Sequence, residues 1–213
     1  MSKIRFVGDI HGKVPQYLQT IEGTDESIQI GDFGLGFGTR GQAAVIDALI
    51  DQVPGRHRFI RGNHDSPDEC LLSSHFIDDG RVEGPMMFVG GASSIDREHR
   101  TEGIDWWPDE ELSYERLLSI VDLYAEVRPP ILITHECPEF FAVDHMIPLV
   151  RGNTNFPSRT RMALDAMYRV AQPKLHIFGH WHQDLYYRHY ATGTTLICLN
   201  ELSFIDIETD DFT

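Results

Sequence analysis

Short apolar runs rich in β-branched residues recur along the chain, and each run ends at a glycine or at polar residues. Runs of this length and composition predict buried strands. Between the first three runs, residues 14–21 and 42–53 place their apolar side chains largely on one side, which predicts two amphipathic helices. This alternation of strands and helices predicts an α/β fold. The five runs cover residues 4–7, 27–30, 57–60, 130–133 and 175–178.

The second half of the chain predicts two longer helices and a closing hairpin. Residues 109–127 carry acidic side chains where a first helical turn would lie, and residues 158–171 begin with Ser158 as a candidate N-cap. Residues 184–207 alternate polar and apolar positions around a glycine, which predicts a β-hairpin that completes a second sheet. No repeat or linker divides the 213 residues, so we expect one domain over residues 1–213.

A polar motif follows each of the five predicted strands. If these strands share one sheet, the polar side chains leave the carboxyl ends of strands, where open α/β sheets collect their sites. Two aspartates, an asparagine and four histidines, without thiolates, form a ligand set that suits manganese, iron, zinc or cobalt. One such motif is weak support for a metal site, but five in order are strong support. The motifs are Gly8-Asp9-Ile10-His11-Gly12, Gly31-Asp32, Gly62-Asn63-His64-Asp65, Thr134-His135-Glu136 and Gly179-His180-Trp181-His182.

Together these motifs resemble the pattern of the calcineurin-like metallophosphoesterase superfamily, which is Asp-x-His, Gly-Asp, Gly-Asn-His-Asp/Glu, His and Gly-His-x-His. The resemblance spans residues 8–182. It implies a fold of two packed mixed β-sheets flanked by helices. It also implies two divalent metal ions, with manganese expected first and iron, zinc or cobalt left open. One ion would be bound by Asp9, His11 and His182 and the other by Asn63, His135 and His180, with Asp32 bridging both.

The resemblance further implies hydrolysis of phosphomonoesters or phosphodiesters. In a two-metal site, the nucleophile would be a hydroxide that bridges the metals and attacks phosphorus in line. His64 resembles the family's catalytic histidine, which protonates the leaving oxygen or stabilises the transition state. Asp65 is expected to orient His64 without contacting the substrate itself. A purely structural role for either residue stays open.

The branch of the superfamily is indicated by two further features. Residues 61–64, Arg-Gly-Asn-His, are shared with Ser/Thr protein phosphatases and diadenosine polyphosphate hydrolases. Those families place Asp-Arg where this chain has Leu35 and Gly36, so Arg40 or Arg61 is expected to replace the missing phosphate-binding arginine. The second histidine of Gly-His-x-His resembles the phosphodiesterase branch. A diesterase or a small-molecule phosphatase is therefore favoured, with a protein phosphatase or a diadenosine polyphosphate hydrolase as the alternative.

A polar loop at residues 90–100 is a second candidate for substrate contact. Arg97, His99 and Arg100 have the charge to meet a phosphate group. Trp106 and Trp107, which follow the loop, can stack on a base or pack the next helix against the sheet, and both interpretations stay open. A nucleotide-like substrate is the narrower expectation.

Composition narrows the partners. The formal net charge is −15 at pH 7, without a broad basic patch in the sequence. This charge disfavours long nucleic acid and favours a small phosphorylated or nucleotide-like substrate. The three cysteines are odd in number and widely spaced, which argues against a disulfide framework and favours a cytoplasmic setting. We expect no membrane segment and no signal peptide, and the oligomeric state stays open.

Two function classes compete with the phosphoesterase hypothesis. The superfamily includes a non-catalytic subunit of a membrane-sorting coat, but that scaffold has a degraded site, whereas this chain keeps every expected ligand. A nuclease is disfavoured by the net charge and by the lack of an evident DNA-binding extension.

Overall fold

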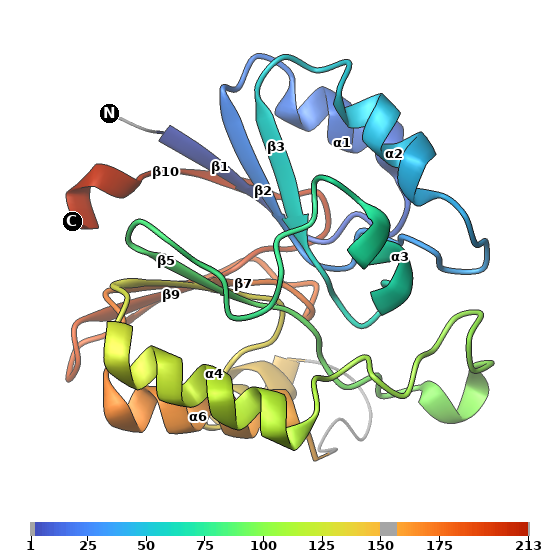
Figure 1. Cartoon of the computed structure of the whole chain (residues 1–213). Coiled ribbons are helices and arrows are strands. Elements are labelled where there is room, and N and C mark those ends of the chain that lie inside the picture. Colours follow the sequence, from blue (N-terminus) through green and yellow to red (C-terminus); the bar gives the residue numbers. More distant parts are fainter. Residues whose placement is uncertain (1–2, 150–156, 213) are drawn as a thin grey trace.

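The computed structural model describes residues 3–149 and 157–212 of the chain. Its strands form two sheets that lie against each other (Figure 1). In the first sheet the central strands are parallel, and the strand nearest the C-terminus is antiparallel to its neighbour. The order of this sheet is β10 (Phe204–Glu208), β1 (Lys3–Val7), β2 (Glu26–Ile30) and β3 (Arg56–Ile60).

The second sheet has four parallel strands with an antiparallel strand at each edge. Both sheets are therefore mixed. Every residue of the four parallel strands is buried, as is usual for parallel strands that are covered on both faces. The order of this sheet is β4 (Val82–Glu83), β5 (Met86–Val89), β6 (Ile131–Thr134), β7 (Leu175–Phe178), β9 (Thr194–Cys198) and β8 (Leu185–His189).

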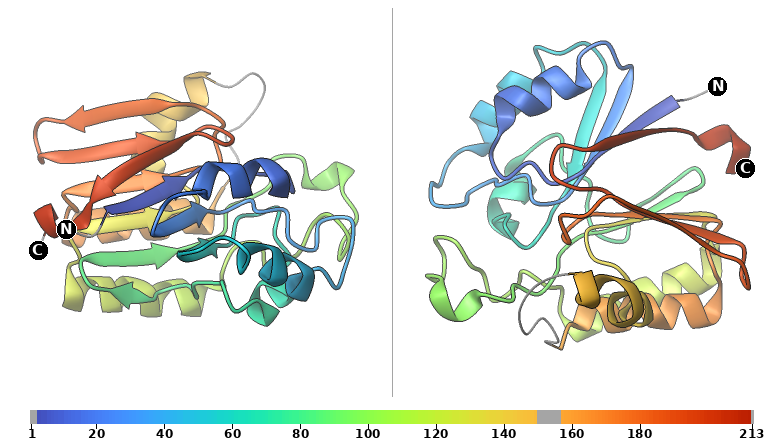
Figure 2. Two further views of the ribbon diagram at one scale, coloured as in Figure 1. Left: turned by 90° about the horizontal axis from the view of Figure 1, so that it is seen from above. Right: turned by 180° about the vertical axis from the view of Figure 1, so that it is seen from behind.

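Helices cover the outer face of each sheet and give four layers (Figures 1 and 2). Over the first sheet lie α1 (Val14–Ile21), α2 (Ala43–Ile50) and α3 (Pro67–Leu72). Over the second sheet lie α4 (Tyr114–Val127), α5 (Glu139–Phe141) and α6 (Arg159–Val170). The side chains of Ser113 and Ser158 cap α4 and α6 by accepting a hydrogen bond from the backbone N–H three residues later.

Three apolar layers separate these elements, and strand alternation sorts the side chains among them. On β1, Phe6 points between the sheets, whereas Val7 packs with the helices of the first sheet. On β6, Ile133 points between the sheets and Leu132 packs with α4 and α6. The layer between the sheets includes Ile4, Phe6, Ile28, Ile30, Ile60, Phe88, Ile131, Ile133 and Ile177.

The prediction of an α/β fold with two mixed sheets flanked by helices is confirmed. All five predicted strands and four predicted helices are present within the described residues. The five strands do not share one sheet but are divided between the two. Strands β1, β2 and β3 lie in the first sheet, whereas β6 and β7 lie in the second. Of the predicted closing segment, β8 and β9 complete the second sheet, but β10 crosses to the first.

The predicted start of the helix at residue 109 is wrong. The helix begins after Ser113, so residues 109–112 precede it. Glu110 and Glu111 are buried there because their carboxylates accept hydrogen bonds from distant parts of the chain. Among the described residues, no helix is both long and apolar enough to cross a membrane.

A buried hydrogen-bonded chain links α6, β7 and the end of β6. The Thr134 hydroxyl donates to the Glu136 carbonyl, so Thr134 Oγ1 accepts from His176 Nε2 at 2.7 Å. His176 Nδ1 then accepts from the Tyr168 hydroxyl at 2.8 Å. Neutral imidazole has one donor and one acceptor, and both are used here. Burial lowers the pKa of His176 to about 3.

This histidine predicts a pH-dependent loss of stability. An unfolded chain protonates histidine below about pH 6.5, whereas folded His176 stays neutral down to about pH 3. The free energy of unfolding therefore falls as the pH drops through this window. Between pH 7 and pH 5 the contribution of His176 to that loss is about 2 kcal/mol. Denaturant unfolding of wild type and His176→Gln at both pH values should show the larger loss in wild type, and parallel losses would contradict the assignment.

Candidate metal centre

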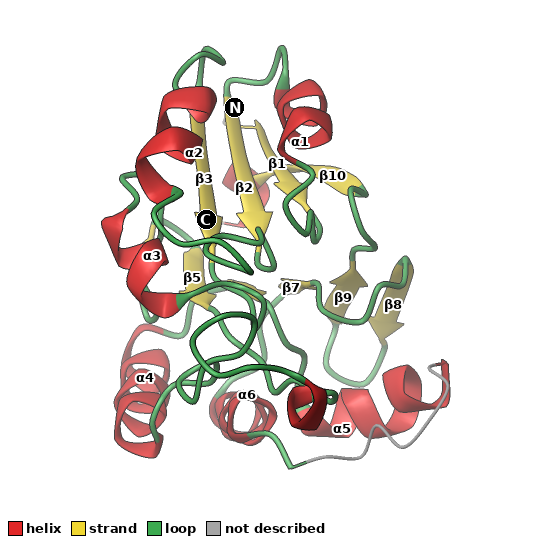
Figure 3. Cartoon of the chain, turned by 90° about the vertical axis from the view of Figure 1, so that its right-hand side faces the viewer, coloured by secondary structure: helices red, strands yellow, loops and turns green. Residues whose placement is uncertain are grey.

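The loops after β1, β2, β3, β6 and β7 meet between the two sheets, and Figure 3 shows these loops in the middle of the view. Because both sheets point the carboxyl ends of their parallel strands toward this region, the five polar motifs converge despite belonging to two sheets. Two groups of candidate ligand atoms lie there, and both include Asp32. Within each group, all the ligand atoms are within 4.8 Å of one another. The first group is Asp9, His11, Asp32 and His182, and the second is Asp32, His135 and His180.

The first group brings two carboxylate oxygens and two imidazole nitrogens together. His11 Nε2 and His182 Nε2 are 2.9 Å apart. Asp9 Oδ2 lies 3.2 Å from His182 Nε2 and 3.8 Å from His11 Nε2. Asp9 Oδ2 is fully buried and accepts no hydrogen bond from the described residues. A buried carboxylate oxygen without a hydrogen-bond donor is costly unless a cation is bound to it.

The second group is centred on His135. Its Nδ1 donates to the Ile30 carbonyl at 3.0 Å, which directs Nε2 toward the cluster. His135 Nε2 lies 3.1 Å from Asn63 Oδ1 and 3.3 Å from Asp32 Oδ1. When His135 is neutral, its Nε2, Asn63 Oδ1 and Asp32 Oδ1 are all acceptors. Their lone pairs therefore point toward a common position, where a cation would fit. His180 completes the group, so the four side chains present the mixed oxygen and imidazole set that divalent transition metals accept.

The electrostatics of the centre favour positive charge. Burial alone lowers the pKa of His135, but the Asp32 carboxylate outweighs it and raises that pKa to about 10. Burial likewise opposes ionisation of Asp32, yet the neighbouring His135 and His64 hold its pKa well below the usual range. The buried Asp32 carboxylate thus stabilises positive charge at this place, and a bound cation would benefit from the same carboxylate. The residues present fit two divalent ions on these grounds.

The glycines of the motifs leave space for ligands from other motifs. An added Cβ at Gly62 would lie 2.1 Å from Asp32 Oδ1, and one at Gly179 would lie 2.3 Å from Asp9 Oδ1. At Gly31, which has a φ of 100°, it would lie 2.4 Å from His135 Nδ1. Each distance is too short for real atoms. Glycine before a ligand is therefore required by close packing of one motif against another.

The backbone is strained where ligands are presented. Four of the six non-glycine described residues with positive φ are candidate ligands. The left-handed conformation costs about 1 to 2 kcal/mol for a residue with a side chain. Such strain persists only where surrounding structure enforces it and often marks a functional site. The four residues are His11 (45°), Asp32 (56°), His180 (68°) and His182 (50°).

His64 lies beside the second group without belonging to it. Its backbone N–H donates to Asp32 Oδ1 at 2.8 Å, and its ring stacks on Phe37 with centroids 5.1 Å apart. Arg100 Nη2 lies 3.0 Å from His64 Nε2, so His64 Nε2 is the acceptor. Burial lowers the pKa of His64, and Arg100 adds to that effect while Asp32 opposes it. His64 therefore lies next to Asp32, at the edge of the second group.

The partners of the Asp65 carboxylate are backbone groups of two loops. It is fully buried, and it accepts hydrogen bonds from the backbone N–H groups of Gly62, Phe33, Gly34 and Leu35 at 2.7 to 3.1 Å. Four such bonds use its acceptor capacity, so it does not support the His64 side chain. Asp65 instead ties the loop after Asp32 to the loop after β3.

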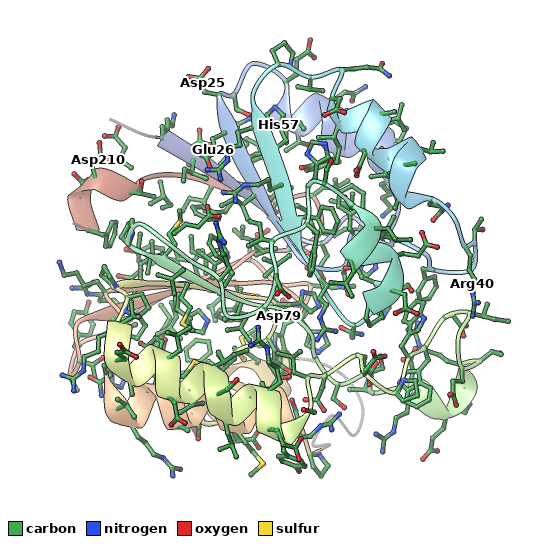
Figure 4. The ribbon with its side chains drawn as sticks, viewed as in Figure 1. Asp25, Glu26, Arg40, His57, Asp79 and Asp210 are labelled. Carbon is green, nitrogen blue, oxygen red and sulfur yellow. The ribbon has the colours of Figure 1, made fainter. Side chains whose placement is uncertain are left out.

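The predicted substrate contacts separate into three groups. Arg100 borders the cavity beside the centre. Arg97 and His99 lie exposed on a short 3-10 turn, and Arg40 is exposed at the outer edge of the molecule, where it donates to the Gly103 carbonyl (Figure 4). Arg61 is buried, pairs with Asp79 at 2.8 Å and is not in the cavity lining. Arg61 therefore does not reach the cavity in which a phosphate group would lie.

Two cavities flank His64. One has a volume of about 340 Å³ and reaches from Asp32 to Glu136 and Arg161, while the other, of about 220 Å³, is bordered by His11 and largely apolar side chains. Neither Trp106 nor Trp107 lines them, so the structure does not support base stacking by these indoles.

Glu136 and Arg161 are functional candidates that the sequence analysis missed. Glu136 lies 3.7 Å from His180 Nε2 and accepts a hydrogen bond from the indole of Trp181. Glu136 directly follows the candidate ligand His135 in the motif Thr134-His135-Glu136, and this position could have marked it as a candidate. Arg161 lies in the first turn of α6, and nothing in the neighbouring sequence sets this arginine apart, so no local signal marked it.

The fold and the donor set together describe an α/β protein with two adjoining candidate metal-binding clusters. Residues 2–184 match the calcineurin-like phosphoesterase family, and the chain belongs to this family. The resemblance seen in the motifs is thereby confirmed. No curated protein matches the chain.

Two solved structures share the fold at low sequence identity. TT1561 of Thermus thermophilus is 12% identical with a TM-score of 0.54, and the match covers 95% of this chain and 90% of that protein. A candidate 5′-nucleotidase from Staphylococcus aureus, solved with alpha-ketoglutarate, is 13% identical with a TM-score of 0.52. That match covers 99% of this chain and 52% of the nucleotidase, so this chain spans about half of its length. Identities this low show a common fold alone.

The strained backbone predicts an unusual order of stability at position 182. Because His182 has a φ of 50°, His182→Gly should be more stable than His182→Ala by about 1 kcal/mol in the metal-free state. The neighbouring Gln183 has no positive φ, so Gln183→Ala should be more stable than Gln183→Gly. Denaturant unfolding in EDTA measures both pairs. The same order at the two positions would show that His182 is not strained.

Proposed function

We propose that the protein is a dinuclear metal-dependent phosphoesterase that hydrolyses small phosphomonoesters or phosphodiesters. The observation that carries the proposal is that one buried carboxylate, Asp32, belongs to both groups of ligand atoms. A carboxylate shared in this way suits two ions held close together, which is the arrangement that in-line displacement at phosphorus uses. Membership of the phosphoesterase family supports the same reaction class.

Asp9, His11 and His182 would hold one ion, and Asn63, His135 and His180 the other, with Asp32 between them. When bound, the ions would supply a water of lowered pKa and would neutralise charge on the phosphate. Manganese is the proposed metal because the mixed oxygen and nitrogen set accepts it; iron, zinc and cobalt suit the same donors.

His64 and Arg100 act on the substrate from the side of the larger cavity. Both line this cavity next to Asn63, so a single phosphate group can accept from both. His64 Nε2 accepts from Arg100 in the free site, so His64 would serve as the proton donor to the leaving oxygen only once a bound phosphate takes over Arg100 and Nε2 is protonated. Stacking on Phe37 fixes the plane of the His64 ring. Asp96 holds the Arg100 guanidinium through two hydrogen bonds of 2.7 Å, which orient it toward His64. Arg100 is thus the proposed replacement for the arginine missing after Asp32.

The two cavities favour a substrate with a substituent on each side of phosphorus. They meet at His64, and each has room for an organic group. This arrangement supports a diesterase or a nucleotide-like substrate, as does the Gly-His-x-His motif. A Ser/Thr protein phosphatase or a diadenosine polyphosphate hydrolase is the second candidate, because both share the sequence Arg-Gly-Asn-His at residues 61–64.

Metal-dependent hydrolysis is the first expected outcome. Protein stripped with EDTA should hydrolyse neither p-nitrophenyl phosphate nor bis-p-nitrophenyl phosphate, and added Mn²⁺ should restore turnover, with the diester preferred. His64→Ala should keep its metal and lose about 100- to 10,000-fold in kcat. Asp32→Asn should lose metal and turnover together. Full activity of Asp32→Asn, or two bound ions without turnover of these esters or of a phosphopeptide, would contradict the proposal.

Arg100 predicts a specific loss of substrate binding and turnover. Removal of its charged hydrogen bonds in Arg100→Ala should lower kcat/KM for both esters by about 10- to 100-fold. Arg169, which is exposed near the end of α6, provides a matched control, and Arg169→Ala should change neither constant. Steady-state kinetics with saturating Mn²⁺ separates the two variants. Equal kinetics of Arg100→Ala and wild type would remove Arg100 from the site.

A further inference from the structure

A buried chain of side chains runs away from the second ligand group and ends at a carboxylate. Asn63 Nδ2 donates to Ser94 Oγ at 3.0 Å, and the Ser94 hydroxyl donates to Glu110 Oε2 at 2.5 Å. The backbone N–H of Ser94 donates to Glu110 Oε1 at 2.9 Å. All three residues are buried, with exposed fractions of 2% to 4%. The chain therefore has no competition from solvent.

The direction of every hydrogen bond in this chain follows from Glu110. The carboxylate has only acceptors, so the Ser94 proton must point toward it. Ser94 Oγ then faces Asn63 with its lone pairs and requires a donor, which only the Asn63 NH₂ group supplies. The Asn63 oxygen consequently points the other way, where Oδ1 lies 3.1 Å from His135 Nε2.

We propose that Glu110 is a positioning residue that acts through Ser94 to turn the oxygen of the Asn63 amide toward the second metal ion. The two ends of an amide are nearly equal in size, so shape alone does not select between its two orientations. A flipped amide would present NH₂ to the second ligand group and repel a cation there. This inference rests on the proposed two-metal centre and extends it to a residue outside the ligand set.

Glu110 is held in place by an arginine that does not touch the centre. Arg61 Nη1 donates to the carbonyls of Asp109 and Glu110, both at 3.0 Å. Arg61 Nε is paired with Asp79 at 2.8 Å, and Asp79 is itself buried and lies near the middle of the view in Figure 4. The arginine predicted to bind phosphate therefore anchors the segment that carries Glu110.

The adjacent Glu111 offers a matched control. It is also buried, and it accepts from the Ser158 hydroxyl at 2.6 Å and from the backbone N–H of Thr160 at 2.8 Å. Its partners lie at the start of α6 and include no metal ligand. Glu110 and Glu111 thus make the same kind of hydrogen bonds, but only those of Glu110 lead to the centre.

The test is calorimetric titration of EDTA-stripped protein with Mn²⁺, in wild type, Glu110→Gln, Ser94→Ala and Glu111→Gln. In Glu110→Gln, the side-chain oxygen stays opposite the Ser94 N–H, and the new NH₂ group faces Ser94 Oγ as a donor. The chain then reverses and favours the flipped Asn63 amide. We expect the affinity of the second ion to fall about 10- to 100-fold, with the first ion unchanged. Asn63→Ala identifies which ion is the second.

Ser94→Ala should produce a smaller loss at the same site, since it frees the Asn63 amide without reversing it, and this variant carries the test if Glu110→Gln does not fold. Glu111→Gln should lower the melting temperature and leave both affinities unchanged. The inference is overturned if Glu110→Gln binds the second ion with wild-type affinity; if that variant does not fold, the same result in Ser94→Ala overturns it. Equal losses of affinity at both sites, or binding of fewer than two ions by wild type, would overturn it as well. Two ions bound by wild type without ester turnover would contradict the proposed function alone.

Discussion

The centre depends on the position of one buried carboxylate. Asp32 follows β2 with a left-handed backbone, has almost no exposure and lies within reach of imidazoles from two sheets. Its charge is the main reason that the pKa of His135 rises to about 10 against the effect of burial. A site that draws protons onto buried imidazole is a site that gains from bound cations. The fold thus concentrates negative charge and acceptor lone pairs at one point.

The surrounding structure holds these acceptors together despite their mutual repulsion. Asp65 fixes two loops through four backbone hydrogen bonds, and the space left by Gly62 and Gly179 allows loops from different sheets to touch. Glu110 is proposed to orient the one neutral oxygen ligand. None of these residues needs to contact substrate. The left-handed backbone at four candidate ligands lowers the stability of the fold, and burial of the apolar layers offsets this cost.

The sequence predicted the strands and the ligand set because both signals are local. Apolar runs and their terminal motifs are contiguous, and ligand chemistry follows from residue type. Two sheets were expected from the family resemblance, but the assignment of each strand to its sheet was not predicted, because pairing partners are set by contacts distant in sequence. The same limit explains Arg61, whose charge suggested phosphate but whose partners lie at Asp79 and Glu110. Residue type does not reveal whether a carboxylate such as Asp65 faces a ligand or a backbone loop.

A crystal structure of Mn²⁺-loaded protein, with anomalous scattering measured at the manganese edge, would test the dinuclear centre directly. We expect two anomalous peaks about 3.5 to 4 Å apart, one on each side of the Asp32 carboxylate. The first should contact Asp9 and the second should contact the oxygen of Asn63. A single peak, or two peaks that do not share Asp32, would contradict the dinuclear centre described above.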